Sequence, residues 1–169
     1  KADLLCYSYD ATQLKFMPDV VVHPLTAEQI SLIMKMANAE MIPVFPRGAG
    51  SGFTGGSLPV TGGIVLATER MNRIVEIDSE NLVATVEPGV VTEQFQQAVE
   101  KLGLFYPPDP GSQAVSTLGG NVAENAGGLR GLKYGVTKDY VMGLHFFDAQ
   151  GRYVKTGSRT VKCATGYNV

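Results

Sequence analysis

Glycine is concentrated in two parts of this sequence, and that distribution constrains the fold more than any other feature. Most of the 20 glycines fall within residues 48–63 and 111–135. Neither cluster is periodic or part of a low-complexity tail. Because glycine costs conformational entropy on folding, two dense clusters inside a chain that is 44% apolar indicate sites where the backbone approaches a ligand closely.

The spacing of apolar residues predicts an α+β fold with mixed strand directions. A helix is expected over about residues 26–40, with Thr26 and Gln29 forming a capping box and an apolar row that ends at Met41. A second helix is expected to be capped by Thr92 and stopped by Gly103, with its inner face formed by Phe95, Val99 and Leu102. Strands are expected at residues 20–23, 43–45, 63–68, 73–78 and 82–87, with a hairpin at 144–156 around Gln150-Gly151.

Composition excludes several classes of function. A net charge of −2 does not suit a surface that follows nucleic-acid phosphates. No apolar run reaches the length of a membrane span, and the N-terminus has no signal-peptide layout, so a cytoplasmic location is expected. Cys6 and Cys163 have no metal-ligand spacing and are interpreted as ordinary reduced thiols.

The first glycine cluster formally matches a dinucleotide fingerprint, with Gly50, Gly52 and Gly55 in the required positions. That fingerprint needs a helix N-terminus directly after it, and residues 55–63 cannot begin a helix. No Gly-Lys-Ser/Thr sequence supports a P-loop. We therefore interpret the cluster as a loop whose peptide N–H groups form an anion-binding concavity, with Pro46 and Arg47 at its entrance; a mobile surface loop is the alternative.

The second glycine cluster follows a stiff segment, residues 107–110, which is either one wall of a cleft or a rigid linker. Asn121 and Asn125 combine with glycines to offer donors and acceptors suited to the edge of a flavin ring, although turn and helix-cap roles explain asparagines equally well. His23 and His145 are expected to be structural. No nucleophile–base set and no metal-ligating cluster can be argued.

Three strings in order carry a resemblance: residues 43–56 (PVFPRGAGSGFTGG), 107–112 (PPDPGS) and 116–135 (STLGGNVAENAGGLRGLKYG). They resemble the FAD-binding (PCMH-type) domain of the vanillyl-alcohol oxidase/p-cresol methylhydroxylase superfamily, within it the branch of glycolate oxidase FAD subunits and D-lactate dehydrogenases. The resemblance implies two subdomains with extended FAD between them. On that basis residues 1–17 are an N-terminal arm, 18–104 the first subdomain and 105–169 the start of an incomplete second one.

The resemblance also implies which residues bind the cofactor. It places the diphosphate on backbone amides of the first cluster and the rest of FAD along the second. The residues are Pro46, Arg47, Gly48, Ala49, Gly50, Ser51, Gly52, Thr54, Gly55, Gly56, Pro108, Asp109, Pro110, Ser112, Thr117, Leu118, Gly119, Gly120, Asn121, Ala123 and Asn125. Some relatives tether the flavin through a histidine where this chain has Ser51, so non-covalent FAD is expected.

The activity implied is oxidation of a small 2-hydroxy acid to a 2-oxo acid by hydride transfer to FAD, with a quinone, an electron-transfer protein or partner subunits as electron acceptor. In this family the segment matching residues 166–168 normally leads into a substrate cap that carries histidines for base and metal chemistry. The chain is therefore expected to be a fragment without turnover of its own, associated with membranes only through partner subunits. The alternatives are another oxidase of the superfamily, acting on an aldonolactone, phenol or ether-lipid precursor, or a non-catalytic nucleotide-binding module.

Overall fold

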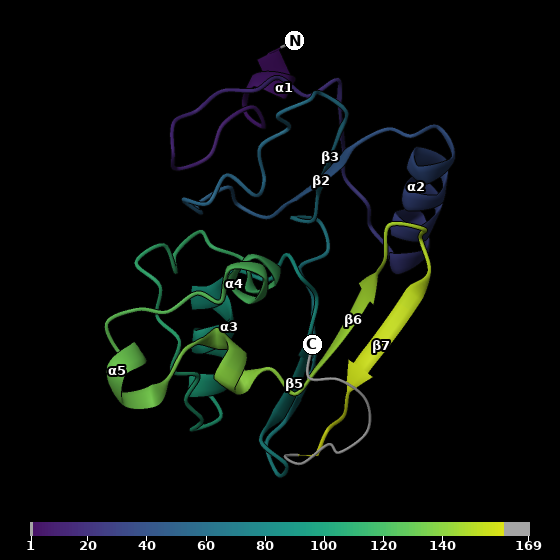
Figure 1. Ribbon diagram of the computed structural model, residues 1–169. Helices are drawn as coiled ribbons and strands as arrows, with labels where there is room; N and C mark the ends of the chain where they lie inside the picture. Colours follow the sequence, from purple (N-terminus) through teal and green to yellow (C-terminus); the bar gives the residue numbers. More distant parts are fainter. Residues whose placement is uncertain (1, 161–169) are drawn as a thin grey trace.

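A parallel sheet forms one half of the molecule. The computed structural model describes residues 2–160 (Figure 1). Its three-stranded sheet has the order β1-β3-β2, with β1 at Val20–Val22, β3 at Ile64–Ala67 and β2 at Val44–Arg47. Ile64 pairs with both outer strands. The central strand β3 is buried throughout, which explains its unbroken apolar sequence.

Helix α2 (Ala27–Ala39) connects β1 to β2, and its predicted start is confirmed. Thr26 Oγ1 accepts a hydrogen bond from the Gln29 N–H, while the Gln29 side chain accepts from the Leu25 N–H at 2.7 Å. Ala37 is buried, as the apolar row predicts. The prediction that Met41 continues this row is wrong, because the helix ends before it and Met41 turns outward with a positive φ and 86% exposure.

A second core lies beneath the sheet. The antiparallel pair β4 (Ile74–Asp78) and β5 (Val83–Val86) packs against α3 (Thr92–Glu100) and α4 (Leu118–Glu124). Val90, Phe95, Val99 and Leu118 are its buried centre. The boundary proposed between residues 104 and 105 passes through this cluster, since Leu104 and Tyr106 both pack against it.

The start of α3 differs from the prediction. Val91 is the N-cap and makes no side-chain cap bond, whereas Thr92 is fully buried as the first helical residue. Its hydroxyl lies 3.0 Å from the Ser116 carbonyl oxygen and accepts from Asn121 Nδ2 at 2.7 Å, so tertiary contacts take the group that was expected to cap the helix. Leu102 lies beyond the last turn and is 53% exposed, which corrects its assignment to the inner face.

The remaining elements surround these two cores. They are α1 (Ala2–Leu5), α5 (Gly131–Tyr134), the 3-10 helix η1 (Thr137–Tyr140), β6 (Gly143–Phe147) and β7 (Tyr153–Gly157). The predicted hairpin is confirmed as β6-β7, and it lies beside α2, where Ser31 Oγ donates to the Gly151 carbonyl oxygen at 2.7 Å. Cys163 and residues 166–168 lie outside the described residues.

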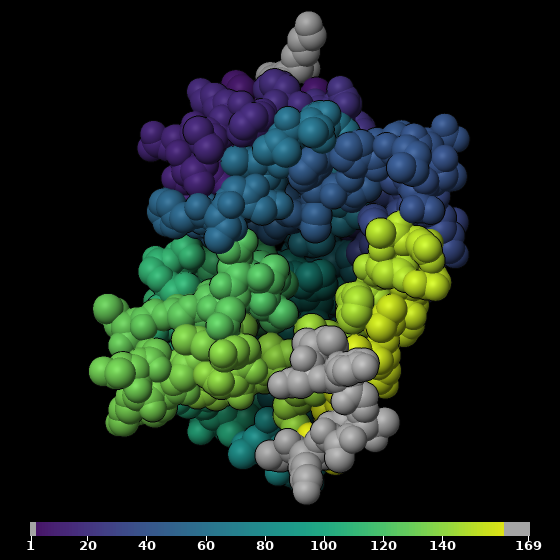
Figure 2. Space-filling view, viewed as in Figure 1, coloured from purple at the N-terminus to yellow at the C-terminus, as the bar shows by residue number. Residues whose placement is uncertain are grey.

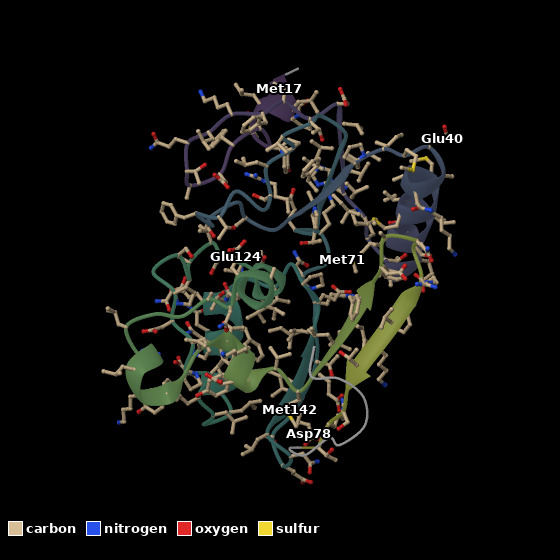
Figure 3. All side chains as sticks on the ribbon, in the orientation of Figure 1. Met17, Glu40, Met71, Asp78, Glu124 and Met142 are labelled. Atoms are coloured by element: carbon tan, nitrogen blue, oxygen red, sulfur yellow. The ribbon has the colours of Figure 1, made fainter. Side chains whose placement is uncertain are left out.

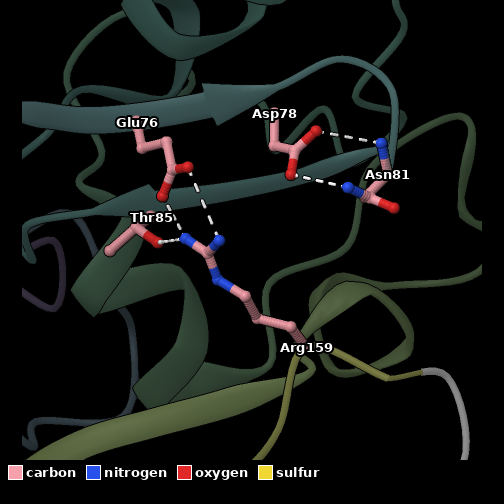
Figure 4. A network of polar contacts seen from close by, with 5 residues as sticks. All are labelled: Glu76, Asp78, Asn81, Thr85 and Arg159. Atoms are coloured by element: carbon pink, nitrogen blue, oxygen red, sulfur yellow. Dashed lines mark hydrogen bonds and ion pairs between the residues drawn. The ribbon is translucent and has the colours of Figure 1, made fainter.

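The segment after β7 is attached to the β4-β5 pair by exposed polar contacts (Figure 4). Arg159 forms an ion pair with Glu76 and donates to Thr85 Oγ1 at 3.3 Å. On the same hairpin, Asp78 accepts from the backbone and side chain of Asn81. Exposed ion pairs of this kind contribute little to stability, so the two apolar cores determine the arrangement.

Candidate functional site

The two glycine clusters face each other across one cleft. A cavity of about 470 Å³ is lined from one side by residues 46–52 and from the other by residues of α4 and the turn before it. Figure 2 shows the cleft as a hollow between the blue and green parts of the surface. The volume falls within the range of small-molecule sites, so segments far apart in the sequence together form a site for a ligand.

Close contacts around the cleft explain two of the glycines. At Gly48, a Cβ atom would overlap Thr117 Oγ1. At Gly119, a Cβ atom would lie 2.6 Å from the Cβ of Pro88 and 2.9 Å from its carbonyl oxygen. Both positions therefore exclude any side chain, which lets the walls of the cleft meet.

Free amide groups characterise the first glycine loop. Within residues 2–160, the backbone N–H groups of residues 48–55 donate no hydrogen bond to the protein. Positive φ angles at Gly50 and Gly55 bend this loop. Gly48 and residues 50–52 are half-buried, and backbone donors in such positions normally find partners, so their unpaired N–H groups beside the cavity are suited to an anionic ligand.

Arg47 supplies a positive charge under this loop. It ends β2, is only 6% exposed and lines the cavity. Its guanidinium makes two long contacts of 3.5 Å, with Ser57 Oγ and the Cys6 carbonyl oxygen, and within the described residues it forms no ion pair. Burial lowers the pKa of Arg47, opposed first by the charge of Asp10, yet an arginine remains charged in proteins. The site thus holds a cation without a carboxylate in direct contact.

A carboxylate reaches across the cleft from the other side. Glu124 lies at the end of α4, facing the segments above it (Figure 3). Its Oε1 accepts a hydrogen bond from Thr54 Oγ1 at 2.6 Å, and the same oxygen lies 3.3 Å from where a Cβ of Gly56 would be. Glu124 therefore ties α4 to the first glycine loop and places a negative charge beside it.

Buried polar contacts fix the position of α4. Thr117 caps the helix by accepting from the Gly120 N–H at 3.3 Å. Asn121 is 2% exposed and donates to the buried Thr92, while Asn125 ends the helix in the left-handed conformation and accepts from the Lys138 N–H at 3.0 Å. The bonds from Asn121 and Asn125 hold this wall of the cleft against α3 and η1.

Most of the residues predicted from the sequence line the cavity. Those that do are Pro46, Arg47, Gly48, Ala49, Gly50, Ser51, Gly52, Thr54, Gly56, Ser112, Thr117, Gly119, Gly120, Asn121 and Ala123. Those placed outside the lining are Gly55, Pro108, Asp109, Pro110, Leu118 and Asn125. Their contacts are internal: the Pro108 carbonyl accepts from Gln96 at 2.8 Å, Asp109 binds Arg130, and Leu118 belongs to the core.

Several lining residues were missed by sequence reasoning. They are Asp10, Ser57, Thr68, Pro88, Ser116, Glu124 and Ala126. Recognition of α4 would have found Glu124, because Gly120, Ala123 and Glu124 share one helical face. The low helix propensity of two successive glycines concealed that helix, whereas nothing local in the sequence indicates Asp10.

The fold and the cleft define a nucleotide-cofactor-binding domain with mixed strand directions. A family model described as "FAD binding domain" matches residues 18–157. The chain belongs to this FAD-binding family, and the resemblance seen in its glycine motifs is confirmed.

Curated relatives carry names from the branch that the motifs indicated. Glycolate oxidase subunit GlcD of Bacillus subtilis is 52% identical over 169 residues, which is 99% of this chain and 36% of the relative. D-lactate dehydrogenase of Archaeoglobus fulgidus is 45% identical over 150 residues, 89% of this chain and 33% of the relative. The chain thus spans about a third of the length of these relatives.

Solved structures agree on the fold. Alkyldihydroxyacetonephosphate synthase superposes with a TM-score of 0.73 at 26% identity, covering 89% of this chain and 27% of the other. Xylooligosaccharide oxidase from Myceliophthora thermophila superposes with a TM-score of 0.78 at 19% identity over 92% of this chain and 33% of the other, which shows the fold alone. The predicted α+β fold, with helices and strands of mixed direction, is confirmed.

The described residues hold neither a metal-ligand cluster nor a membrane-spanning helix. Among residues 2–160, no group of three or more His, Cys, Asp or Glu side chains is arranged to hold a metal ion. No helix in that range is long and apolar enough to cross a membrane.

Proposed function

We propose that the cleft binds FAD non-covalently, with the diphosphate against the amides of residues 48–55. The unpaired N–H groups of that loop carry this proposal, because N–H donors complement the anionic oxygens of a diphosphate. The buried positive charge of Arg47 adds to the attraction of these N–H groups for the phosphates. Ser51 offers no atom for the usual covalent attachment to a flavin, which supports the non-covalent mode.

The rest of the cofactor is assigned to the second wall. Ser112, Thr117, Gly119, Gly120, Asn121 and Ala123 line the cavity there, and we assign the flavin end to the α4 side. The predicted residues outside the cavity lining are assigned an indirect role, which is to hold the walls of the cleft in place. They are Gly55, Leu118, Asn125 and residues 108–110. The division into an arm, a first subdomain and a second subdomain remains part of this proposal.

We infer further that the whole protein oxidises a small 2-hydroxy acid to a 2-oxo acid. Support comes from the names of the relatives, glycolate oxidase and D-lactate dehydrogenase. Bound FAD would supply the hydride acceptor, while residues of this chain bind it, orient it and exclude water around its diphosphate. The electrons would then pass to a quinone, an electron-transfer protein or partner subunits.

An ether-lipid-forming enzyme is the second candidate, because alkyldihydroxyacetonephosphate synthase shares the fold at 26% identity. The identity of 52% to a glycolate oxidase subunit favours the hydroxy-acid reaction. We infer no catalytic acid or base among the described residues.

Titration of the chain with FAD tests the first step. We expect saturable binding with a shifted flavin spectrum, and release of all flavin on denaturation. Anaerobic addition of glycolate or D-lactate should leave the flavin of this chain oxidised. Absence of saturable binding would overturn the cofactor proposal, flavin that stays attached after denaturation would overturn the non-covalent mode, and bleaching would overturn the prediction that the chain is inactive alone.

A further inference from the structure

The N-terminal segment, residues 2–17, is folded onto the cofactor cleft. It lies outside the range matched by the FAD-binding family, 18–157, and sequence reasoning treated it as an arm. In the structure Ser8 is fully buried and Asp10 is 5% exposed. The Phe16 N–H donates to the Ser8 carbonyl at 2.8 Å, and Tyr9 forms a bridge with Lys15, so the segment has a fixed conformation.

This segment contacts Arg47 through two groups and places the charge of Asp10 nearby. The Cζ of Arg47 lies 5.7 Å from the centre of the Tyr7 ring, within the range of a cation–π contact. The Cys6 carbonyl oxygen accepts from Arg47 Nη2 at 3.5 Å. Asp10 lines the same cavity and raises the pKa of Arg47 against the effect of burial.

Tyr7 is itself held in place by Glu69 and His23. Its hydroxyl donates to Glu69 Oε1 at 2.6 Å, and its ring meets His23 edge-on at 5.4 Å between centroids. His23 Nδ1 lies 3.1 Å from the same Glu69 oxygen. The ring is therefore held by His23, directly after β1, and by Glu69, in the turn after β3, and its face lies toward Arg47.

The ring stabilises the guanidinium without neutralising it. A carboxylate in direct contact would compensate the charge of Arg47 and compete with an anionic ligand. An aromatic face and a carbonyl oxygen stabilise a buried cation while leaving its full charge available. Gly50 completes the arrangement, since a Cβ there would overlap the guanidinium.

We propose that Tyr7 is a positioning residue of the diphosphate site, holding Arg47 under the glycine loop so that the charge faces the phosphates of FAD. This inference rests on the proposed function of the cleft. It assigns to a segment outside the matched family range a direct part in cofactor affinity.

A double-mutant cycle with FAD titration tests it. Tyr7→Leu should weaken FAD binding about tenfold, as expected for loss of a buried cation–π contact. The affinity of ADP, measured by its competition with FAD, should fall by the same factor. Tyr7→Phe keeps the aromatic face and should restore affinity to within about threefold of the parent chain. In an Arg47→Met background, Tyr7→Leu should change the affinity less than about twofold. Leu14→Ala, an exposed change in the same segment, is the matched control.

The outcomes separate the two proposals. If the parent chain does not bind FAD saturably, the proposed function of the cleft fails. If the parent chain binds FAD and Tyr7→Leu weakens binding equally with Arg47 or Met at position 47, or not at all, the positioning role is overturned. Should Tyr7→Leu not fold, Tyr7→Met removes the aromatic face with a longer apolar side chain and carries the same cycle, and equal effects in both backgrounds would again contradict the inference.

Discussion

Gly48 and Thr117 lie in contact, although one directly follows β2 and the other is the N-cap of α4. The contact is so close that a Cβ at Gly48 would overlap Thr117 Oγ1, the same oxygen that caps α4. The walls of the cleft meet here because the backbone at Gly48 carries no Cβ and the Thr117 side chain can pack directly against it. We expect perturbation of this contact to affect both stability and cofactor binding.

Gly48→Ala tests that contact. Overlap with Thr117 should cost about 1–3 kcal/mol of the free energy of unfolding and weaken FAD binding, because either the cap or the loop must move. Denaturant unfolding measures the first effect. Gly111→Ala is the control, since a Cβ there meets nothing within 4 Å; a loss of stability at Gly111 equal to that at Gly48 would contradict the explanation.

Gly50→Ala separates backbone strain from displacement of Arg47. Gly50 and Gly103 both have positive φ, +67° and +73°, so alanine at either position should cost about 1 kcal/mol of stability. Only at Gly50 would the new Cβ overlap the guanidinium of Arg47. FAD affinity should fall about tenfold for Gly50→Ala, consistent with loss of a charge-assisted contact, and remain unchanged for Gly103→Ala. Equal affinities of the two variants would argue against a role for Arg47.

Glu124→Gln should strengthen FAD binding. The amide can still accept from Thr54, whereas the negative charge beside the glycine loop is removed, and like charges repel. We expect the affinity for FAD to increase about fivefold at low ionic strength. This gain should shrink at higher ionic strength, because salt screens the repulsion. Glu100→Gln makes the same change of charge at an exposed site outside the cleft. A weaker complex for Glu124→Gln would mean that the carboxylate supports the cofactor.

Tyr7 should make stability depend on alkaline pH. Burial, followed by the hydrogen bond and charge of Glu69, raises the pKa of Tyr7 from 10.0 to about 12. Because the unfolded chain then loses this proton first, the contribution of Tyr7 is complete below pH 10 and is lost as the pH rises toward 12. Spectroscopic titration of the phenol measures the pKa of Tyr7. Denaturant unfolding at increasing alkaline pH, with Tyr7→Phe as reference, measures the loss of stability. Equal alkaline loss of stability in both proteins would contradict the assignment.

Local patterns in the sequence predict some features of this molecule and leave others hidden, for physical reasons. The strands, the capped start of α2 and the β6-β7 hairpin follow from spacing and turn residues alone. Helix α4 does not, because Gly119 and Gly120 disfavour a helix locally, whereas the close approach of Pro88 that requires a glycine at position 119 is a tertiary contact. Thr92 was misassigned as a cap for the same reason, since its hydroxyl bonds to residues distant in sequence.

The candidate site also has one part that the sequence predicts and one part that it does not. The first glycine loop and Arg47 are adjacent in sequence, so their association is predictable. The contribution of Asp10 and Tyr7 depends on a tertiary contact with residues that no spacing rule connects to them.

The amide signals of residues 48–55 provide the most direct test of the central claim. In NMR spectra of the isotope-labelled chain, addition of FAD should move these N–H resonances downfield as they acquire phosphate acceptors, with the largest shifts between Gly48 and Gly52. Saturable FAD binding that leaves these resonances in place would contradict the account, since the diphosphate would then lie elsewhere.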